Sequence, residues 1–311
     1  AVSIEPFLAN QIEVLKGPAS LLYGNGAIGG AVNVVDGRIP EFATARPLEG
    51  RAELRAGSVN DERTGMLRLD GTSASGRLVF HLDALHRETG DVDIPGYAES
   101  AALRAEHGHD HDDGDHADAR GTLPNSFVRT DSGALGLSWV GDRGFIGFGQ
   151  SLFNTRYGVP GHVHVEDHDH DHDHDHDHDH DHDDGHGAVR IVMDQRRSEL
   201  RGGMDDFGPF QSLRARVAHT DYTHTEYEGD EVGTVFDNES LEARIELAHR
   251  PLAGWEGAFG LQWSQRDFAA VDPADVRGTL QHRVLALGIE GERTWLAWCD
   301  ETLRELDRLA A

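Results

Sequence analysis

Histidine and aspartate alternate along the stretch from His162 to Gly187, which reads HVHVEDHDHDHDHDHDHDHDHDDGHG. Eleven of the chain's 21 histidines lie in this stretch, together with eleven acidic residues. Neutral imidazole is a ligand of zinc, nickel, copper(II) and cobalt, and carboxylate oxygens can complete the coordination shell. We therefore expect metal ions to bind here, at His162, His164, His168, His170, His172, His174, His176, His178, His180, His182 and His186.

A second, shorter cluster reads HGHDHDDGDH and offers His107, His109, His111 and His116. Such acidic, polar segments do not fold by themselves, so we expect many overlapping weak sites and not one rigid site. Their negative charge raises the local concentration of cations, so we expect both segments to capture and concentrate metal ions. A repeat that expanded without a selected role is the alternative, and it would chelate metal as well. The single cysteine and three methionines argue against copper(I).

The elements that carry these segments show a period of two. In RLVFHLDA, for example, His81 and Asp83 share a polar face with Arg77, while Leu78, Phe80 and Leu82 form the opposite face. Alternation over such lengths predicts strands and not helices. Nine strands are expected, at 51–57, 63–70, 77–88, 127–140, 144–157, 189–203, 209–224, 238–250 and 255–268.

The links between these strands alternate in length. We expect tight turns at 71–76, 141–143, 205–208 and 251–254, and longer links at 58–62, 89–126, 158–188 and 225–237. In an up-and-down sheet, alternate links lie at the same end, which places both histidine clusters together. Short turns at one end and long loops at the other are typical of outer-membrane barrels. The alternative is a soluble sandwich, which would bury the apolar faces against a second sheet.

Bulk composition narrows the classes of function. The formal net charge of the 311-residue chain is -28, which excludes duplex nucleic acid as a partner. One cysteine, Cys299, can build neither a disulfide framework nor a thiolate cluster. The sequence contains no run of about 18 apolar residues, so we expect no membrane-spanning helix. No nucleophile–base pattern emerges either, so we do not expect an enzyme.

A glycine-rich motif precedes the strands, in QIEVLKGPASLLYGNGAIGGAVNVVDGRIP from Gln11 to Pro40. Its order is strand, turn, short helix, glycine-rich turn and strand. Gly24, Gly26 and Gly29 have the G-x-G-x-x-G spacing of a phosphate loop, but a strand follows where a helix N-terminus would be needed. A dinucleotide site is therefore not expected.

The same segment closely resembles the last part of the plug domain of TonB-dependent outer-membrane receptors. The matching positions include Glu13, Gly17, Pro18, Tyr23, Gly24, Gly26, Gly29, Gly30 and Asn33, and Lys16 stands where arginine is usual. The resemblance implies a plug inside a barrel of 22 antiparallel strands. It also implies active import of a scarce nutrient across the bacterial outer membrane, driven by the TonB complex. The combination of GNGAIGGAVNVVDGRIP, LPNSF and histidine-rich loops is most similar to the zinc-uptake receptors.

The expected organisation is mainly β. Residues 1–45 are the C-terminal part of a plug, 46–270 are the first nine strands of a barrel with histidine-rich loops at 105–118 and 162–187, and 271–311 are an atypical helical tail. The front of the plug, with the segment that contacts TonB, and the remaining strands are expected outside this chain. We expect the chain alone not to close a barrel, because an open sheet edge is not stable in lipid.

Three functions follow from these residues. The first is a TonB-dependent receptor that imports zinc, with loops that capture the ion. The second is a receptor of the same fold for a siderophore or another metal complex, and the third is a surface protein that buffers metal without transport. A transport site should be more ordered than the loops. The side chains with lumen-facing parity that could serve it are His81, Asp83 and His224.

Overall fold

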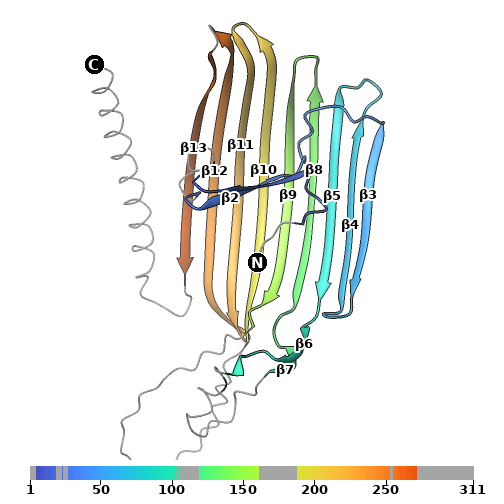
Figure 1. The fold of residues 1–311 in the computed structure, drawn as a ribbon, viewed down its shortest axis with the longest axis vertical. Coiled ribbons are helices and arrows are strands. Elements are labelled where there is room, and N and C mark those ends of the chain that lie inside the picture. Colours follow the sequence, from blue (N-terminus) through green and yellow to red (C-terminus); the bar gives the residue numbers. More distant parts are fainter. Residues whose placement is uncertain are drawn as a thin grey trace, which may run out of the picture.

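The computed structural model describes residues 5–18, 23, 27–101, 104, 119–160, 188–252 and 255–271, which form strands joined by turns and links (Figure 1). No helix in these ranges is long and apolar enough to cross a membrane. The strands are β1 (Gln11–Lys16), β2 (Gly30–Val35), β3 (Leu48–Gly57), β4 (Glu62–Thr72), β5 (Leu78–Thr89), β6 (Val92–Tyr97), β7 (Arg120–Leu123), β8 (Val128–Val140), β9 (Gly144–Gly158), β10 (Val189–Phe207), β11 (Phe210–Glu228), β12 (Glu231–Leu252) and β13 (Trp255–Val271).

Nine of these strands form one antiparallel sheet in the order β13-β12-β11-β10-β9-β8-β5-β4-β3. Neighbours in the sheet are neighbours in the chain, apart from the small pair β6–β7 inserted between β5 and β8 (Figure 1). All nine predicted strands are confirmed, and so is the mainly β class. The up-and-down order is the one that alternating amphipathic strands produce when they build a barrel wall.

The predicted alternation of link lengths is wrong at two places. The link expected at 225–237 does not exist as a loop, because β11 runs to Glu228 and β12 begins at Glu231, with a turn at Gly229 between them. The link between β3 and β4 is also short. Successive links nevertheless lie at alternate ends of the sheet, because this depends only on the number of strands between them. We call the end that carries the β5–β8 and β9–β10 links the loop end, and the opposite end the turn end.

The sheet has an apolar outer face and a polar inner face. On β8 the outer side chains Leu135, Leu137 and Trp139 are 61%, 50% and 50% exposed. The neighbouring outer rows continue this surface with Ile146, Phe148, Leu200, Ile245, Phe259, Leu261 and Trp263. Exposed apolar surface of this extent is costly in water and is suited to lipid. The inner face carries charged residues that contact one another, such as Asp70, Asp83 and Glu199, and is the lumen side.

The plug segment forms the hairpin-like pair β1–β2, which crosses the inner face of the sheet (Figure 1). Two motif residues bind each other across it, because Asn33 donates to the carboxylate of Glu13 at 2.9 Å. Gly30, opposite Lys16, has a φ of 152°, and a Cβ there would lie 2.4 Å from the carbonyl oxygen of Leu15. The strand–turn–strand prediction is confirmed at both ends. Gly24 and Gly26 lie outside the described residues.

The chain that leaves β2 packs against small residues of the barrel wall. A Cβ at Gly136 of β8 would lie 1.7 Å from the carbonyl oxygen of Arg38, and one at Gly147 of β9 would lie 2.6 Å from Cγ2 of Ile39. Ile39 itself is 3% exposed. These glycines therefore allow the backbone of the plug to touch the sheet directly.

Replacing Gly136 with alanine is expected to destabilise the protein by about 1–3 kcal/mol, the usual cost of overpacking a well-packed contact. The matched control is Gly133→Ala on the same strand, because a Cβ at Gly133 meets Asp83 O at an ordinary 3.4 Å. Urea unfolding of the refolded protein measures the stability of both variants. Equal stability of the two variants would contradict the described plug–wall contact.

Candidate functional site

The two histidine-rich segments lie outside the described residues, but the residues at their bases do not. Asn125, in the first link, donates one amide hydrogen bond to Val159 O at 3.1 Å and another to Val189 O at 2.6 Å. Val159 and Val189 border the second link, and they bond each other at 3.0 Å. Asn125 has a φ of 59°, a conformation that asparagine tolerates better than most residues. The bases of both segments are therefore joined at one place at the loop end.

This arrangement predicts that both segments share one side of the membrane. Epitope tags inserted after Gly114 and after Gly185 should both be labelled by antibody on intact cells, since the loop end is the extracellular end of a barrel with this asymmetry. A tag after Gly208, in the turn between β10 and β11, is the matched control and should be labelled only after the outer membrane is opened. Labelling of one histidine-segment tag without the other would contradict the topology.

His81 is fully enclosed between two carboxylates on the inner face. Its Nδ1 lies 2.7 Å from Oδ1 of Asp70, and its Nε2 lies 2.9 Å from Oδ2 of Asp83. The His81 and Asp83 side chains are 0% and 1% exposed. Asp70 is held by Arg68 at 2.8 Å, and Asp83 by Arg38 at 3.3 Å. With both ring nitrogens engaged by protein groups, this geometry favours a structural role over metal ligation.

The His81 cluster connects the barrel wall to the plug. Arg38 follows β2 in the chain, so its ion pair with Asp83 joins the plug segment to β5. Arg68 donates to the carbonyl oxygens of Leu8 and Asp36, at 3.0 and 3.2 Å, on either side of β1–β2. The predicted pair His81 and Asp83 is thus brought together, as parity implied. Asp70, Arg68 and Arg38 were not predicted, because only the strand register brings them there.

His224 lies nearer the loop end and keeps one ring nitrogen available. Its Nδ1 is 3.1 Å from the hydroxyl of Tyr222, and its ring centroid is 5.2 Å from that of Phe236. Its Nε2 is buried, lies 3.6 Å from Oε1 of Glu226 and has no hydrogen-bond partner within the described ranges. An imidazole nitrogen beside a carboxylate is a ligand pair suited to zinc. The structure does not bring His224 and His81 together.

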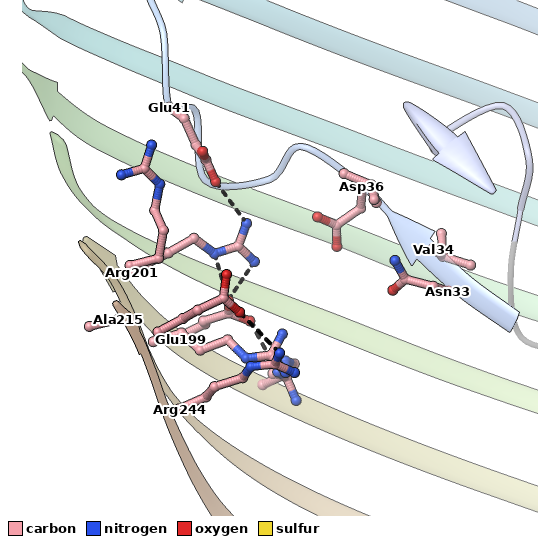
Figure 2. Close-up of a pocket in the computed structure, with 13 residues that line it drawn as sticks. Asn33, Val34, Asp36, Glu41, Glu199, Arg201, Ala215 and Arg244 are labelled. Carbon is pink, nitrogen blue, oxygen red and sulfur yellow. Dashed lines mark hydrogen bonds and ion pairs between the residues drawn. The ribbon is translucent and has the colours of Figure 1, made fainter. Parts of the chain in front are cut away.

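The inner face also holds a cavity of about 550 Å³ between the plug and strands β10 to β12. Figure 2 shows Glu41 and Arg201 pointing toward each other across it, with Glu199 and Arg244 on the wall and Asn33 and Asp36 on the plug side. Glu199 pairs with Arg201 at 2.6 Å and with Arg197 at 3.0 Å. The alternation of polar and apolar residues does not predict this cavity, since it gives neither the position of the plug segment nor the strand register.

The outer face carries one cluster that the sequence analysis missed. His219 and Glu239 approach to 3.0 Å, and Asp221 lies 3.7 Å from the same imidazole nitrogen. Their ligand atoms lie within 4.8 Å of one another. The exposed apolar side chains Val217 and Leu241 lie beside this cluster on the same face.

Comparison with known proteins gives two family matches. The TonB-dependent Receptor Plug Domain matches residues 1–31, which include β1 and most of the glycine-rich motif. A second family, described as Virulence activator alpha C-term, matches residues 229–307. Within the described ranges that segment consists of the barrel strands β12 and β13. The helical tail expected at 271–311 begins at the last described residue and otherwise lies outside them, so it stays a prediction.

Several solved structures share the fold. The siderophore receptor PirA from Pseudomonas aeruginosa is 17% identical with a TM-score of 0.54, over 89% of this chain and 39% of that one. The FrpB iron transporter from Neisseria meningitidis is 12% identical with a TM-score of 0.60, over 86% and 37%. The ferric-catecholate import receptor Fiu from E. coli K12 is 12% identical with a TM-score of 0.56, over 84% and 40%.

The chain thus spans at most about two fifths of the length of these solved structures. The solved structures that share this fold are described as receptors or transporters. Together, these comparisons show a plug-domain match at residues 1–31, followed in the described residues by strands with the fold of part of a TonB-dependent receptor barrel, a fold of the bacterial outer membrane.

Proposed function

We propose that the chain is part of a TonB-dependent receptor that imports a metal, and that the metal is zinc. One observation carries the proposal: fifteen histidines lie in two links whose bases are joined through Asn125 at the loop end. Imidazole and carboxylate are zinc ligands, and the hydrogen bonds of Asn125 bring the described ends of both links together at the loop end. The loops raise the metal concentration at that end.

Passage through the barrel needs an ordered ligand below the loops, and His224 with Glu226 is the pair we assign to it. Both lie on the inner face of β11, and the free Nε2 of His224 faces the Glu226 carboxylate. The contacts of Arg38 and Arg68 then hold the plug against the wall until energy is supplied. We assign that step to the TonB complex of the inner membrane, on the strength of the plug match alone.

A siderophore receptor is the second candidate. It is favoured by the solved structures, which are described as siderophore, iron and ferric-catecholate receptors or transporters. In that case the histidine segments are accessory and the cargo is a ferric complex. The third candidate is a surface protein that buffers metal without transport, and it predicts no dependence on energy.

Growth of a deletion strain that expresses the complete receptor separates these candidates. Zinc import predicts rescue under zinc starvation and no rescue under iron starvation supplemented with a ferric siderophore. The reverse result would support the second candidate. His224→Ala should reduce rescue under zinc starvation, whereas His86→Ala, on the outer face, should leave it unchanged. Equal growth of the two variants would remove His224 from the transport path.

A further inference from the structure

Three arginines lie side by side on the inner face at the cavity shown in Figure 2. Arg201 of β10 is the direct partner of Arg216 of β11, which is in turn the partner of Arg244 of β12. We call these three residues the arginine row. Like charges directly opposite each other on neighbouring strands destabilise a sheet. A row of three is therefore expected to be balanced by negative charge.

The two arginines at the ends of the row, Arg201 and Arg244, each pair with an acidic residue, whereas Arg216 in the middle does not pair with any that the structure describes. Arg201 pairs with Glu199 at 2.6 Å and with Glu41 at 3.4 Å. Arg244 pairs with Glu246 at 3.2 Å. Across the described residues, Arg216 makes neither a hydrogen bond nor an ion pair, although it lines the cavity. Glu199 and Glu242 attract it through space, while Arg201 and Arg244 repel it.

The cavity has room for a group that would complete the row. Its volume is about 550 Å³, and five arginines and four acidic residues line it, which leaves one positive charge. Of the two acidic residues on the plug side of the cavity, Glu41 pairs with Arg201, and Asp36 is already paired with Arg38 at 3.5 Å. A guanidinium presents a planar fork of donors that matches a carboxylate in two parallel hydrogen bonds. The free donors of Arg216 therefore suit an oxyanion and not a cation.

We propose that Arg216, flanked by Arg201 and Arg244, is a carboxylate-binding site of the barrel lumen. The site lies nearer the turn end than His224, because Arg201 is closer along β10 to Phe207 than to Val189. The carboxylate belongs either to a soluble metal chelate inside the lumen or to another segment of the complete receptor. The inference needs a closed barrel but does not depend on which metal is imported.

Citrate, a small tricarboxylate, is the probe for the first source. Calorimetry on the complete receptor in detergent should show citrate binding to the wild type, with affinity reduced tenfold or more in Arg216→Gln, since hydrogen bonds between charged groups contribute about 1.5–3 kcal/mol. The matched control is Arg196→Gln. Arg196 lies on the outer face of β10 opposite Asp221, so its loss removes the same charge away from the cavity. The control should bind citrate like the wild type.

Thermal unfolding tests the second source. If a carboxylate of the receptor already occupies the site, citrate does not bind, and Arg216→Gln lowers the melting temperature by several degrees relative to Arg196→Gln. If nothing occupies it, Arg216→Gln relieves repulsion within the arginine row, and the melting temperature stays the same or rises. Absence of citrate binding together with an unchanged or raised melting temperature overturns the proposal. Neither result depends on metal uptake, so failure of this inference is distinguishable from failure of the proposed function.

Discussion

Replacing His81 with leucine is expected to lower the free energy of unfolding of the complete receptor by about 3–5 kcal/mol, the usual cost of breaking a buried, hydrogen-bonded charge cluster. His81 is the group between Asp70 and Asp83, and leucine would leave the two carboxylates facing each other without the imidazole between them. The other oxygen of Asp83, Oδ1, is buried with no partner among the described residues, so Asp83 then depends on Arg38 alone. Unfolding in urea measures the effect.

The control for this prediction lies on the same strand. His86 approaches Asp131 at 2.6 Å on the outer face, but the two side chains are 50% and 55% exposed. An exposed pair of this kind contributes about 1 kcal/mol or less, so His86→Leu should change stability little. If His81→Leu and His86→Leu were equally stable, the His81 cluster would not hold the plug to the wall. Limited proteolysis should in addition cut the plug segment sooner in His81→Leu.

Deleting residues 164–186 from the complete receptor is expected to slow zinc uptake about tenfold or more when zinc is scarce, and to change it little when zinc is plentiful. A charged binding segment at a mouth raises the local concentration and the rate of capture by factors of about 10 to 1,000, but it does not alter the passage itself. Uptake of radioactive zinc, measured across a range of zinc concentrations, tests this. The control replaces 164–186 with an equally long Gly/Ser segment.

Calorimetry on a peptide of residues 162–186 should complement the deletion. Eleven histidines in one segment exceed the ligands of one zinc site, so more than one zinc should bind per peptide. Mild acid should release the metal, because only neutral imidazole is a ligand and its unperturbed pKa is about 6.5. A single tight site, or a deletion that abolishes uptake at every concentration, would show that the segment is the transport site itself.

Alternation predicted the barrel strands well because lipid imposes it. Wherever one face of a strand meets lipid and the other meets the lumen, apolar and polar residues must alternate, as Leu135, Leu137 and Trp139 do on β8. The ends of β11 and β12 extend beyond this region and carry polar residues on both faces, so their period is lost. The prediction therefore ended β11 at residue 224 and began β12 at 238. The pair β6–β7 was missed because both strands are short and Pro95 and Gly96, which are rare inside strands, lie within β6.

The candidate sites were less predictable, because parity gives the face of a side chain and not its partner. His81 and Asp83 lie two positions apart on one strand, and their proximity followed from the sequence. Asp70 reaches the same imidazole only because it is the register partner of His81, and Arg38 arrives from the plug. Arg201, Arg216 and Arg244 align for the same reason. The alternation of residues along a strand determines which face of the sheet a side chain lies on. The strand register and the position of the plug segment determine which charged groups contact each other.

The central claim, energy-dependent import of zinc, is tested most directly by uptake of radioactive zinc into cells that express the complete receptor. We expect uptake at limiting zinc to require the receptor, and to fall to the level of cells without it when a protonophore collapses the proton-motive force or when TonB is deleted. Binding of zinc to the cell surface should persist under both treatments. Uptake that continues undiminished without proton-motive force or TonB, or surface binding that is never followed by uptake, would contradict the account.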